Sequence, residues 1–340
     1  VSVGTVTAQL LYEIGAPHYL NPDVTSYFET IRLTADGPDR VAVSGVRGGP
    51  PPPDLKVALN YLGGYRNSMT FGLAGLAVER KAELLEKALW QVVGDRGQFD
   101  AVDVKLIGSH QPDPETNDEA LSYLRVTVKD RDPDKVGRRF SRAAVELALS
   151  HYPGFFVTSP PGEATSYAVY WPTSIPAALV PMRVSLASQQ WEVSSVAPDT
   201  GPAPPPAEGG DGGGDSRGPR EVSISAGTAR LPLGTIAGAR SGDKGGNANV
   251  GFWVATPEAY RWLSSYLTVD RLHHLLPEAE ELRIERYELP NLLALNFVVF
   301  GLLGEGVSSS TRTDPQAKSL GEFLRARLVE IPRSLLTEDG

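Results

Sequence analysis

The stretch Arg240-Ser241-Gly242-Asp243-Lys244-Gly245-Gly246-Asn247-Ala248-Asn249 sets charged and amide side chains among three glycines. Residues 231–239 before it and 250–255 after it predict strands, so the stretch predicts a glycine-rich turn within one sheet. Side chains on such a turn project from a rigid scaffold, where binding and catalytic residues are common. The alternative is a tight hairpin whose Asp and Asn bond only their own backbone. A functional site is favoured because a structural turn does not need Arg, Asp and Lys together.

The side chains of this stretch suit acid–base chemistry on an anionic substrate. We predict that Asp243, beside Lys244, acts as a carboxylate base. Lys244 or Arg240 is predicted to bind a phosphate or carboxylate group. Asn247 and Asn249 share one face of an extended segment, where two amides can polarise a carbonyl oxygen as an oxyanion hole does. Cross-strand hydrogen bonding is an equally weighted alternative for these two asparagines.

Residues elsewhere in the chain are weaker candidates. Arg47, on the glycine-flanked segment 45–49, is predicted to bind an anion, and Lys56 on a neighbouring strand is a second cation for the same role. Asn296 lies within an apolar run and is predicted to be a hydrogen-bonded core amide. Asp314 and Lys318, four residues apart at the start of a predicted helix, favour an ordinary i,i+4 ion pair.

Several kinds of site are missing from the sequence. Lys244 is followed by Gly245 where a phosphate-binding loop has Ser or Thr, and no Gly-x-Gly-x-x-Gly or Gly-x-Ser-x-Gly segment occurs in the expected context. The five histidines are scattered and the chain has no cysteine, which excludes disulfides and thiolate metal ligands. We therefore expect no metal and no cofactor.

Composition places the chain among globular proteins. Hydrophobic residues make up 41% and charged residues 21%, and the net charge of −9 argues against a nucleic-acid partner, which would require a basic face. No apolar run is long enough to span a bilayer and no signal peptide is recognisable, so a cytoplasmic enzyme without membrane contact is expected.

A Pro- and Gly-rich segment divides the 340 residues. Residues 197–220 hold few large apolar side chains and are predicted to be an interdomain linker. Residues 1–196 predict a mixed α/β domain, with strands at 27–34, 40–43, 55–59, 102–106, 124–128 and 155–157 and helices at 79–93 and 134–151.

The region 221–336 predicts an α+β sandwich. Thr256 and Thr268 are helix N-caps, strands are expected at 282–288 and 293–303 with the second buried on both faces, and a helix is expected at 316–329. Helices on one side of the sheet leave its other face open, which makes homo-oligomerisation or a larger complex a reasonable expectation.

Six blocks of this sequence, in this order, resemble the AtuA family of acyclic terpene utilisation proteins. They are 7–14, 19–24, 43–48, the Arg-Ser-Gly-Asp-Lys-Gly run with Asn247 and Asn249, 287–297 and 314–321. The resemblance implies a ferredoxin-like fold for 221–336 and a role in acyl-CoA-linked breakdown of terpenoids. It also places further sequence before residue 7, so we expect a chain truncated or processed before Val1.

The resemblance and the residues together suggest an enzyme acting on a branched or terpenoid acyl-CoA. A hydration, dehydration or carbon–carbon lyase step is expected, with Asp243 as acid/base, Asn247 and Asn249 on the thioester carbonyl, and Arg240, Lys244 and Arg47 on anionic groups. The alternative is a non-catalytic acyl-CoA-binding or assembly subunit of a carboxylase or hydratase complex. A third reading is that the glycine turn only stabilises the sheet.

Overall fold

The computed structural model describes residues 1–108, 113–148, 152–193 and 227–336. The chain divides into two compact units. The first unit combines Val1–Leu59 with Tyr170–Gly340, and the second is Asn60–Val169. The predicted linker at 197–220 lies outside the described residues.

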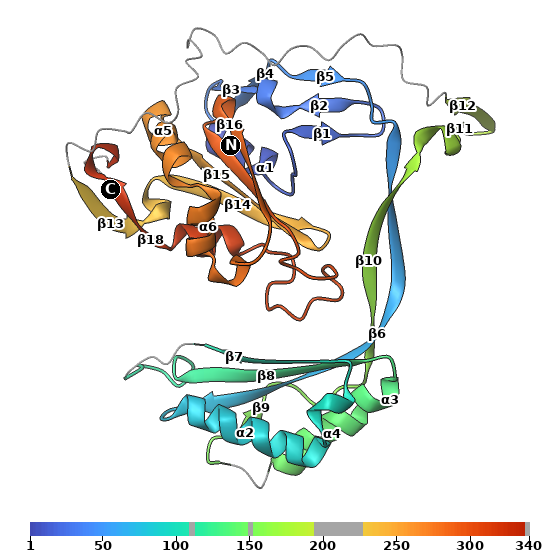
Figure 1. Ribbon diagram of the computed structural model, residues 1–340, viewed down its shortest axis with the longest axis vertical. Coiled ribbons are helices and arrows are strands. Elements are labelled where there is room, and N and C mark those ends of the chain that lie inside the picture. The colour runs from blue at the N-terminus through green and yellow to red at the C-terminus, as the bar shows by residue number, and fades with distance from the viewer. Residues whose placement is uncertain (109–112, 149–151, 194–226, 337–340) are drawn as a thin grey trace. The chain divides into compact units, whose positions relative to one another are not determined.

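The second unit is a sheet with helices layered on one face (Figure 1). The strand order is β10-β6-β8-β7, and β9 also pairs with β6. The strands are β6 (Asp54–Ala74), β7 (Ala101–Ile107), β8 (Leu121–Asp130), β9 (Phe156–Val157) and β10 (Thr165–Pro176), and the helices are α2 (Val78–Val93), α3 (Pro133–Val136) and α4 (Arg138–Leu147). The part of β6 before residue 60 and the part of β10 after residue 169 belong to the first unit. The core forms because Met69, Phe71 and Leu73 alternate along β6 and point toward the buried faces of the helices.

Two elements here differ from the sequence prediction. The strand expected at 55–59 is the beginning of β6, which has 21 residues in all and ends at Ala74. The helix expected at 134–151 is broken at Gly137, whose backbone is not helical. A Cβ at Gly137 would lie 2.9 Å from the carbonyl oxygen of Pro133, so the glycine permits this break. The helix 79–93 and the strands 102–106 and 124–128 are confirmed.

The C-terminal part of the first unit is a four-stranded antiparallel sheet of order β14-β15-β17-β16. Its strands are β14 (Ala237–Lys244), β15 (Asn247–Val254), β16 (Ile284–Leu289) and β17 (Ala294–Val299), and its helices are α5 (Pro257–Tyr266), α6 (Val269–Leu275) and α7 (Leu320–Arg325). A separate pair of strands, β13 (Thr228–Pro232) and β18 (Leu328–Pro332), adjoins α7. The predicted caps are confirmed, since Thr256 and Thr268 accept hydrogen bonds from backbone N–H groups of α5 and α6. Every residue of β17 is buried, as the sequence predicts.

The predicted ends of the central hairpin were wrong. Arg240 to Lys244 belong to strand β14 rather than to a turn, and the turn itself is only Gly245-Gly246. A two-residue hairpin turn suits glycine because its residues need unusual backbone angles, and Gly245 has φ +65°. Charged side chains are tolerated within β14 because it is an edge strand of its sheet.

The predicted helix at 316–329 was too long. Helix α7 covers only Leu320–Arg325, and 328–332 form strand β18. Val329 and Ile331 alternate into the core while β18 pairs with β13. Pairing with a strand about 100 residues earlier therefore overrides the local helical pattern.

The beginning of the chain covers the face of this sheet opposite its helices. On β15, Val250 and Phe252 point into the core with α5 and α6, whereas the intervening Gly251 contacts Leu11. Leu11 and Ile14 anchor a second apolar cluster on that face. The segment holds α1 (Val3–Leu10), the three strands β1 (His18–Leu20), β2 (Thr25–Tyr27) and β5 (Arg47–Gly49), and the hairpin β3 (Arg32–Ala35) with β4 (Val41–Ser44). The N-terminal residues thus cover the sheet face that we expected from the sequence to be open.

A last hairpin of the first unit pairs β11 (Met182–Leu186) with β12 (Gln189–Val193). Across the described residues, no helix combines the length and the apolar character that crossing a membrane requires.

Replacing Leu11 tests whether the N-terminal segment is part of the folded unit. Leu11→Ala should lower the free energy of unfolding by about 2–5 kcal/mol, because the side chain is 0% exposed and its removal leaves a cavity. Urea unfolding followed by Trp fluorescence reports mainly on this unit, which holds four of the five tryptophans. Leu20→Ala, at a residue 63% exposed, is the control and should change stability by about 0.5 kcal/mol or less. Equal effects of the two variants would contradict the packing.

Candidate functional site

A cavity of about 360 Å³ lies at the β14–β15 turn of the first unit. It brings together two carboxylates and two ammonium groups from three separate segments of the chain. Its lining consists of Glu13, Lys56, Tyr170, Asp243, Lys244, Gly245, Gly306, Val307 and Ser308. Such a convergence of charged groups in one concave site is typical of a binding or catalytic centre.

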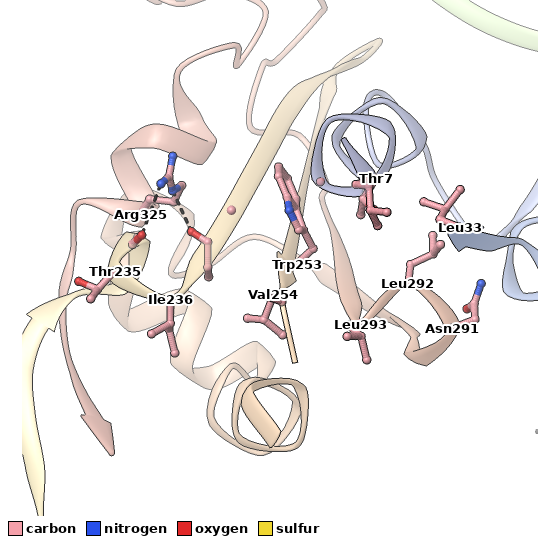
Figure 2. A pocket seen from close by; sticks show the side chains of 16 residues that line it. Thr7, Leu33, Thr235, Ile236, Trp253, Val254, Asn291, Leu292, Leu293 and Arg325 are labelled. Atoms are coloured by element: carbon pink, nitrogen blue, oxygen red, sulfur yellow. Dashed lines mark hydrogen bonds between the residues drawn. The ribbon is translucent and has the colours of Figure 1, made fainter. Parts of the chain in front are cut away.

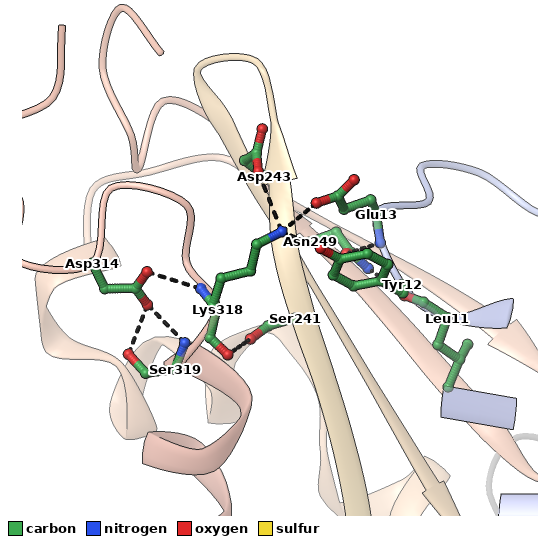
Figure 3. A network of polar contacts seen from close by, with 9 residues as sticks. All are labelled: Leu11, Tyr12, Glu13, Ser241, Asp243, Asn249, Asp314, Lys318 and Ser319. Carbon is green, nitrogen blue, oxygen red and sulfur yellow. Dashed lines mark hydrogen bonds and ion pairs between the residues drawn. The ribbon is translucent and has the colours of Figure 1, made fainter. Parts of the chain in front are cut away.

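Lys318 joins the two carboxylates at the edge of this cavity (Figure 3). Its ammonium donates hydrogen bonds to Oε1 of Glu13 and to the hydroxyl of Tyr12. The same Nζ lies 3.7 Å from Oδ1 of Asp243. One cation therefore holds a carboxylate from the N-terminal segment beside a carboxylate of β14.

The backbone around Lys318 is fixed by hydrogen bonds. Oδ1 of Asp314 accepts from the backbone N–H of Lys318 at 3.0 Å, and Oδ2 accepts from the N–H and the hydroxyl of Ser319 at 2.7 and 2.6 Å. The Ser241 hydroxyl donates to the carbonyl of Lys318 at 3.3 Å and accepts from the N–H of Gly321 at 2.8 Å. These contacts tie the start of α7 to β14 and aim the Lys318 side chain at the strand edge.

Two buried asparagines fix the position of Glu13. Oδ1 of Asn249 accepts from the backbone N–H of Glu13 at 2.8 Å, and Nδ2 donates to the carbonyl of Leu11 and to Oδ1 of Asn296. Asn296 donates in turn to the carbonyl of Gly15 at 2.7 Å. Both asparagines are 0% exposed, so the prediction of a hydrogen-bonded core amide at Asn296 is confirmed.

Gly242 makes room for this arrangement on β14. A Cβ at Gly242 would lie 2.6 Å from Cγ of Glu13 and 3.0 Å from the ring of Tyr12. The absence of a side chain lets Tyr12 and Glu13 lie directly on the strand beside Asp243. The glycine of the sequence motif is therefore needed for close approach rather than for turn geometry.

The Lys318 network shifts the pKa values of its members. Burial raises the pKa of Glu13, but the hydrogen bonds from Lys318 and Tyr12 and the positive charges of Lys318 and Lys244 outweigh it, so the pKa is lowered. Burial lowers the pKa of Lys318, but hydrogen bonds with Glu13 and Tyr12 and the Glu13 charge raise it overall. The pair therefore stays ionised on both sides across the neutral range.

Lys244 behaves differently from Lys318. Burial lowers its pKa, and the like charge of Lys56 lowers it further; Glu13 and Asp243 only partly oppose these effects. The ammonium of Lys244 lies 5.6 Å from the ring centroid of Tyr19, and that of Lys56 lies 5.5 Å from the ring centroid of Tyr170. Two cations thus face one cavity and disfavour each other.

The structure brings together only part of the set predicted from the sequence. Asp243 and Lys244 line the cavity. The guanidinium of Arg240 stacks 4.3 Å from the ring centroid of Tyr12, and the exposed Arg47 lies on β5 outside the cavity lining.

The two motif asparagines also lie outside the cavity lining. Asn247 accepts a hydrogen bond from the N–H of Gly301 at 2.9 Å, and Asn249 binds the N-terminal segment. The role proposed for them on a thioester carbonyl stays a prediction.

Three contributors were missed by sequence reasoning. Tyr12 and Glu13 fall within the first block that carries the family resemblance, but nothing local to them indicates a site. Lys318 was predicted to pair with Asp314, which was wrong: Asp314 binds the backbone of Lys318, and the ammonium goes to Glu13. No group of three or more metal-ligating His, Asp or Glu side chains occurs among the described residues.

A second, more apolar cavity of about 520 Å³ lies near the other end of β14 (Figure 2). Thr7, Leu33, Trp253 and Leu292 are among its lining residues. Arg325 closes one side, where its guanidinium donates to the carbonyls of Ala237 and Gly234.

Two protein-family models match this chain. The model described as acyclic terpene utilisation family protein AtuA matches residues 1–186, and the AtuA ferredoxin-like domain matches residues 231–330. The chain belongs to the AtuA family. The second match covers the β14–β17 sheet with α5, α6 and α7, in agreement with the predicted ferredoxin-like domain. No curated protein and no solved structure matches the chain.

Replacing Lys318 in this AtuA-family chain should produce a pH-dependent loss of stability. The lowered pKa of Glu13 means that its stabilisation is present above its unfolded value of 4.5 and is lost as the pH falls through the folded value. The raised pKa of Lys318 means that its contribution is present below 10.5 and is lost as the pH rises through the folded value. Lys318→Met should therefore lower Tm most between about pH 4.5 and 10.5, by an amount corresponding to about 1 kcal/mol or less.

Thermal unfolding of both proteins across that pH range measures the difference. Lys87→Met, at an exposed lysine of α2 in the second unit, is the matched control and should show no such pH window. A constant Tm difference at every pH would contradict the ion-pair network.

Proposed function

We propose that the chain is an enzyme of acyclic terpenoid or branched acyl-CoA breakdown that moves a proton next to a thioester carbonyl, as a hydratase or dehydratase. The observation that carries the proposal is the cavity in which Asp243 and Glu13 face Lys244 and Lys56. Family membership supports the terpenoid context. A carbon–carbon lyase step would use the same proton transfer and is the neighbouring alternative.

Asp243 is the base in this proposal. Its carboxylate lines the cavity and lies 3.7 Å from the Lys318 ammonium, which holds it at the cavity edge. The Glu13 carboxylate accepts a hydrogen bond from Lys318, and its backbone N–H donates to Oδ1 of Asn249. Glu13 therefore serves as a fixed partner of Lys318 rather than as the base. The ammonium of Lys244 faces the same space and stabilises negative charge that develops on the thioester oxygen.

A single acid–base residue is sufficient for both proton transfers of the dehydration. Asp243 takes the proton from the carbon next to the thioester carbonyl, and the electron pair moves onto the thioester as an enolate. When the pair returns to form the carbon–carbon double bond, the β-hydroxyl leaves as water with the proton that Asp243 gives back. Hydration is the reverse of this sequence, so the carboxylate ends each turnover as it began.

The assembly-subunit alternative differs in what Asp243 does. In an acyl-CoA-binding subunit without catalysis, the same cavity would hold an anionic group and Asp243 would only orient Lys318. Such a subunit would bind acyl-CoA without turnover and would co-purify with a catalytic partner.

Asp243→Asn tests the proposed base. The variant should lose about 10²- to 10⁴-fold in kcat on a branched β-hydroxyacyl-CoA while its Tm stays near that of the wild type, because the amide cannot take the proton. Formation of the conjugated thioester, followed by ultraviolet absorbance, measures turnover. Glu322→Gln is the control, since this carboxylate lies on α7, is 67% exposed and pairs with Arg325 away from the cavity lining. Wild-type turnover in Asp243→Asn would remove the base assignment.

A further inference from the structure

The lysines of the first unit are gathered at one place. Residues 1–59 and 170–340 contain three lysines in all, Lys56, Lys244 and Lys318. Lys56 and Lys244 line the cavity, and Lys318 binds the two carboxylates at its edge. Arginine serves the other cationic positions of this unit, including the exposed ion pairs of Arg261 and Arg325. The lysine side chains of this unit, with their compact ammonium groups, are therefore all located in or beside the cavity.

When Lys318 at the cavity edge is counted, the positive charges around the cavity exceed the negative ones. Three ammonium groups face two carboxylates, and Lys318 is the partner of both carboxylates. Neither Lys56 nor Lys244 makes an ion pair with any residue in the described ranges 1–108, 113–148, 152–193 and 227–336. Two lysines without carboxylate partners therefore line one small cavity.

The hairpin turn that follows Lys244 is closely packed against its neighbours. A Cβ at Gly245 would lie 3.0 Å from the ring of Tyr170, and one at Gly246 would lie 2.2 Å from the carbonyl oxygen of Gly304. The N–H of Leu303 donates to the carbonyl of Gly246 at 3.0 Å, which fixes the hairpin turn against the 301–306 loop. A rigid turn with Lys244 at its start holds that ammonium in place for a ligand.

We infer that Lys56, beside Lys244 in the cavity lining, binds a carboxylate on the acyl group of the substrate, so that the substrate is a thioester of a dicarboxylic acid. This inference rests on the proposed function, because it takes Asp243 as the base. Asp243 lines the same cavity of about 360 Å³, so the anion must lie close to the carbon that loses its proton. The phosphates of CoA are separated from the thioester by the whole pantetheine arm and cannot occupy this space at the same time.

The charge count agrees with this substrate class. Proton removal turns the thioester into an enolate, so a dicarboxylic half-thioester carries two negative charges on its acyl portion at that point. Two ammonium groups, Lys56 and Lys244, face those charges. A monocarboxylic thioester would leave Lys56 without a counter-charge beside Lys244, whose pKa is already lowered by burial and by the charge of Lys56.

The test compares two thioesters that differ in one group. The probes are a branched β-hydroxyacyl-CoA and the same compound with its terminal methyl replaced by a carboxylate. Wild-type protein should show a KM about 10- to 100-fold lower for the carboxylated compound, in keeping with a charge-assisted contact. Lys56→Met should abolish that preference by raising the KM of the carboxylated compound alone. Lys87→Met, on α2 of the second unit, should keep the preference.

Calorimetry with free CoA and with the free dicarboxylic acid separates the sources of the anion. Binding of the dicarboxylic acid that is lost in Lys56→Met supports the inference even if neither thioester is turned over, in which case the proposed function fails by itself. Turnover of both thioesters with equal KM, or an equal rise of both KM values in Lys56→Met, overturns the inference and leaves the proposed function standing. Lys56-dependent binding of free CoA alone would assign the site to a CoA phosphate and would also overturn it.

Discussion

The buried amide pair of Asn249 and Asn296 is the contact on which the candidate site depends. Each asparagine is fully buried, and an unpaired amide there would cost about 1–3 kcal/mol, so the pair requires the backbone of Leu11–Gly15 as its partner. This requirement docks the N-terminal segment on the sheet face opposite α5 and α6. Glu13 reaches Lys318 only because its backbone is held in this way.

Sequence patterns predicted those parts of the fold that local physics decides. Threonine caps, the helix at 79–93 and a fully buried strand within the apolar run 294–303 follow from hydrogen bonding and apolar periodicity within a few residues. The observed strand β17 ends at Val299, four residues before the predicted end. The shortened α7 and the 21-residue β6 could not be predicted in the same way, because their extents are set by pairing with distant strands. Long-range pairing decides where those elements end.

The residues of the candidate site also fall into those that local sequence could predict and those that it could not. Asp243 and Lys244 stood out because they sit together in a short glycine-rich run. Glu13 and Lys318 are 305 residues apart, and each has an ordinary neighbourhood in sequence, so only the fold reveals that they form one ion pair. Asn249 stood out for its chemistry, and the fold places it among backbone groups, where it accepts a hydrogen bond from the N–H of Glu13.

The electrostatics of the cavity favour a ligand over a purely structural turn. Lys318 lies within ion-pair distance of two carboxylates at once, as in a structural ion pair. Burial instead disfavours the charged form of Lys244, and the like charge of Lys56 disfavours it further. A sheet needing only stability would be better served by a neutral side chain at either position. Binding an anion between them removes this repulsion, so the unfavourable arrangement of the free protein becomes favourable in the complex.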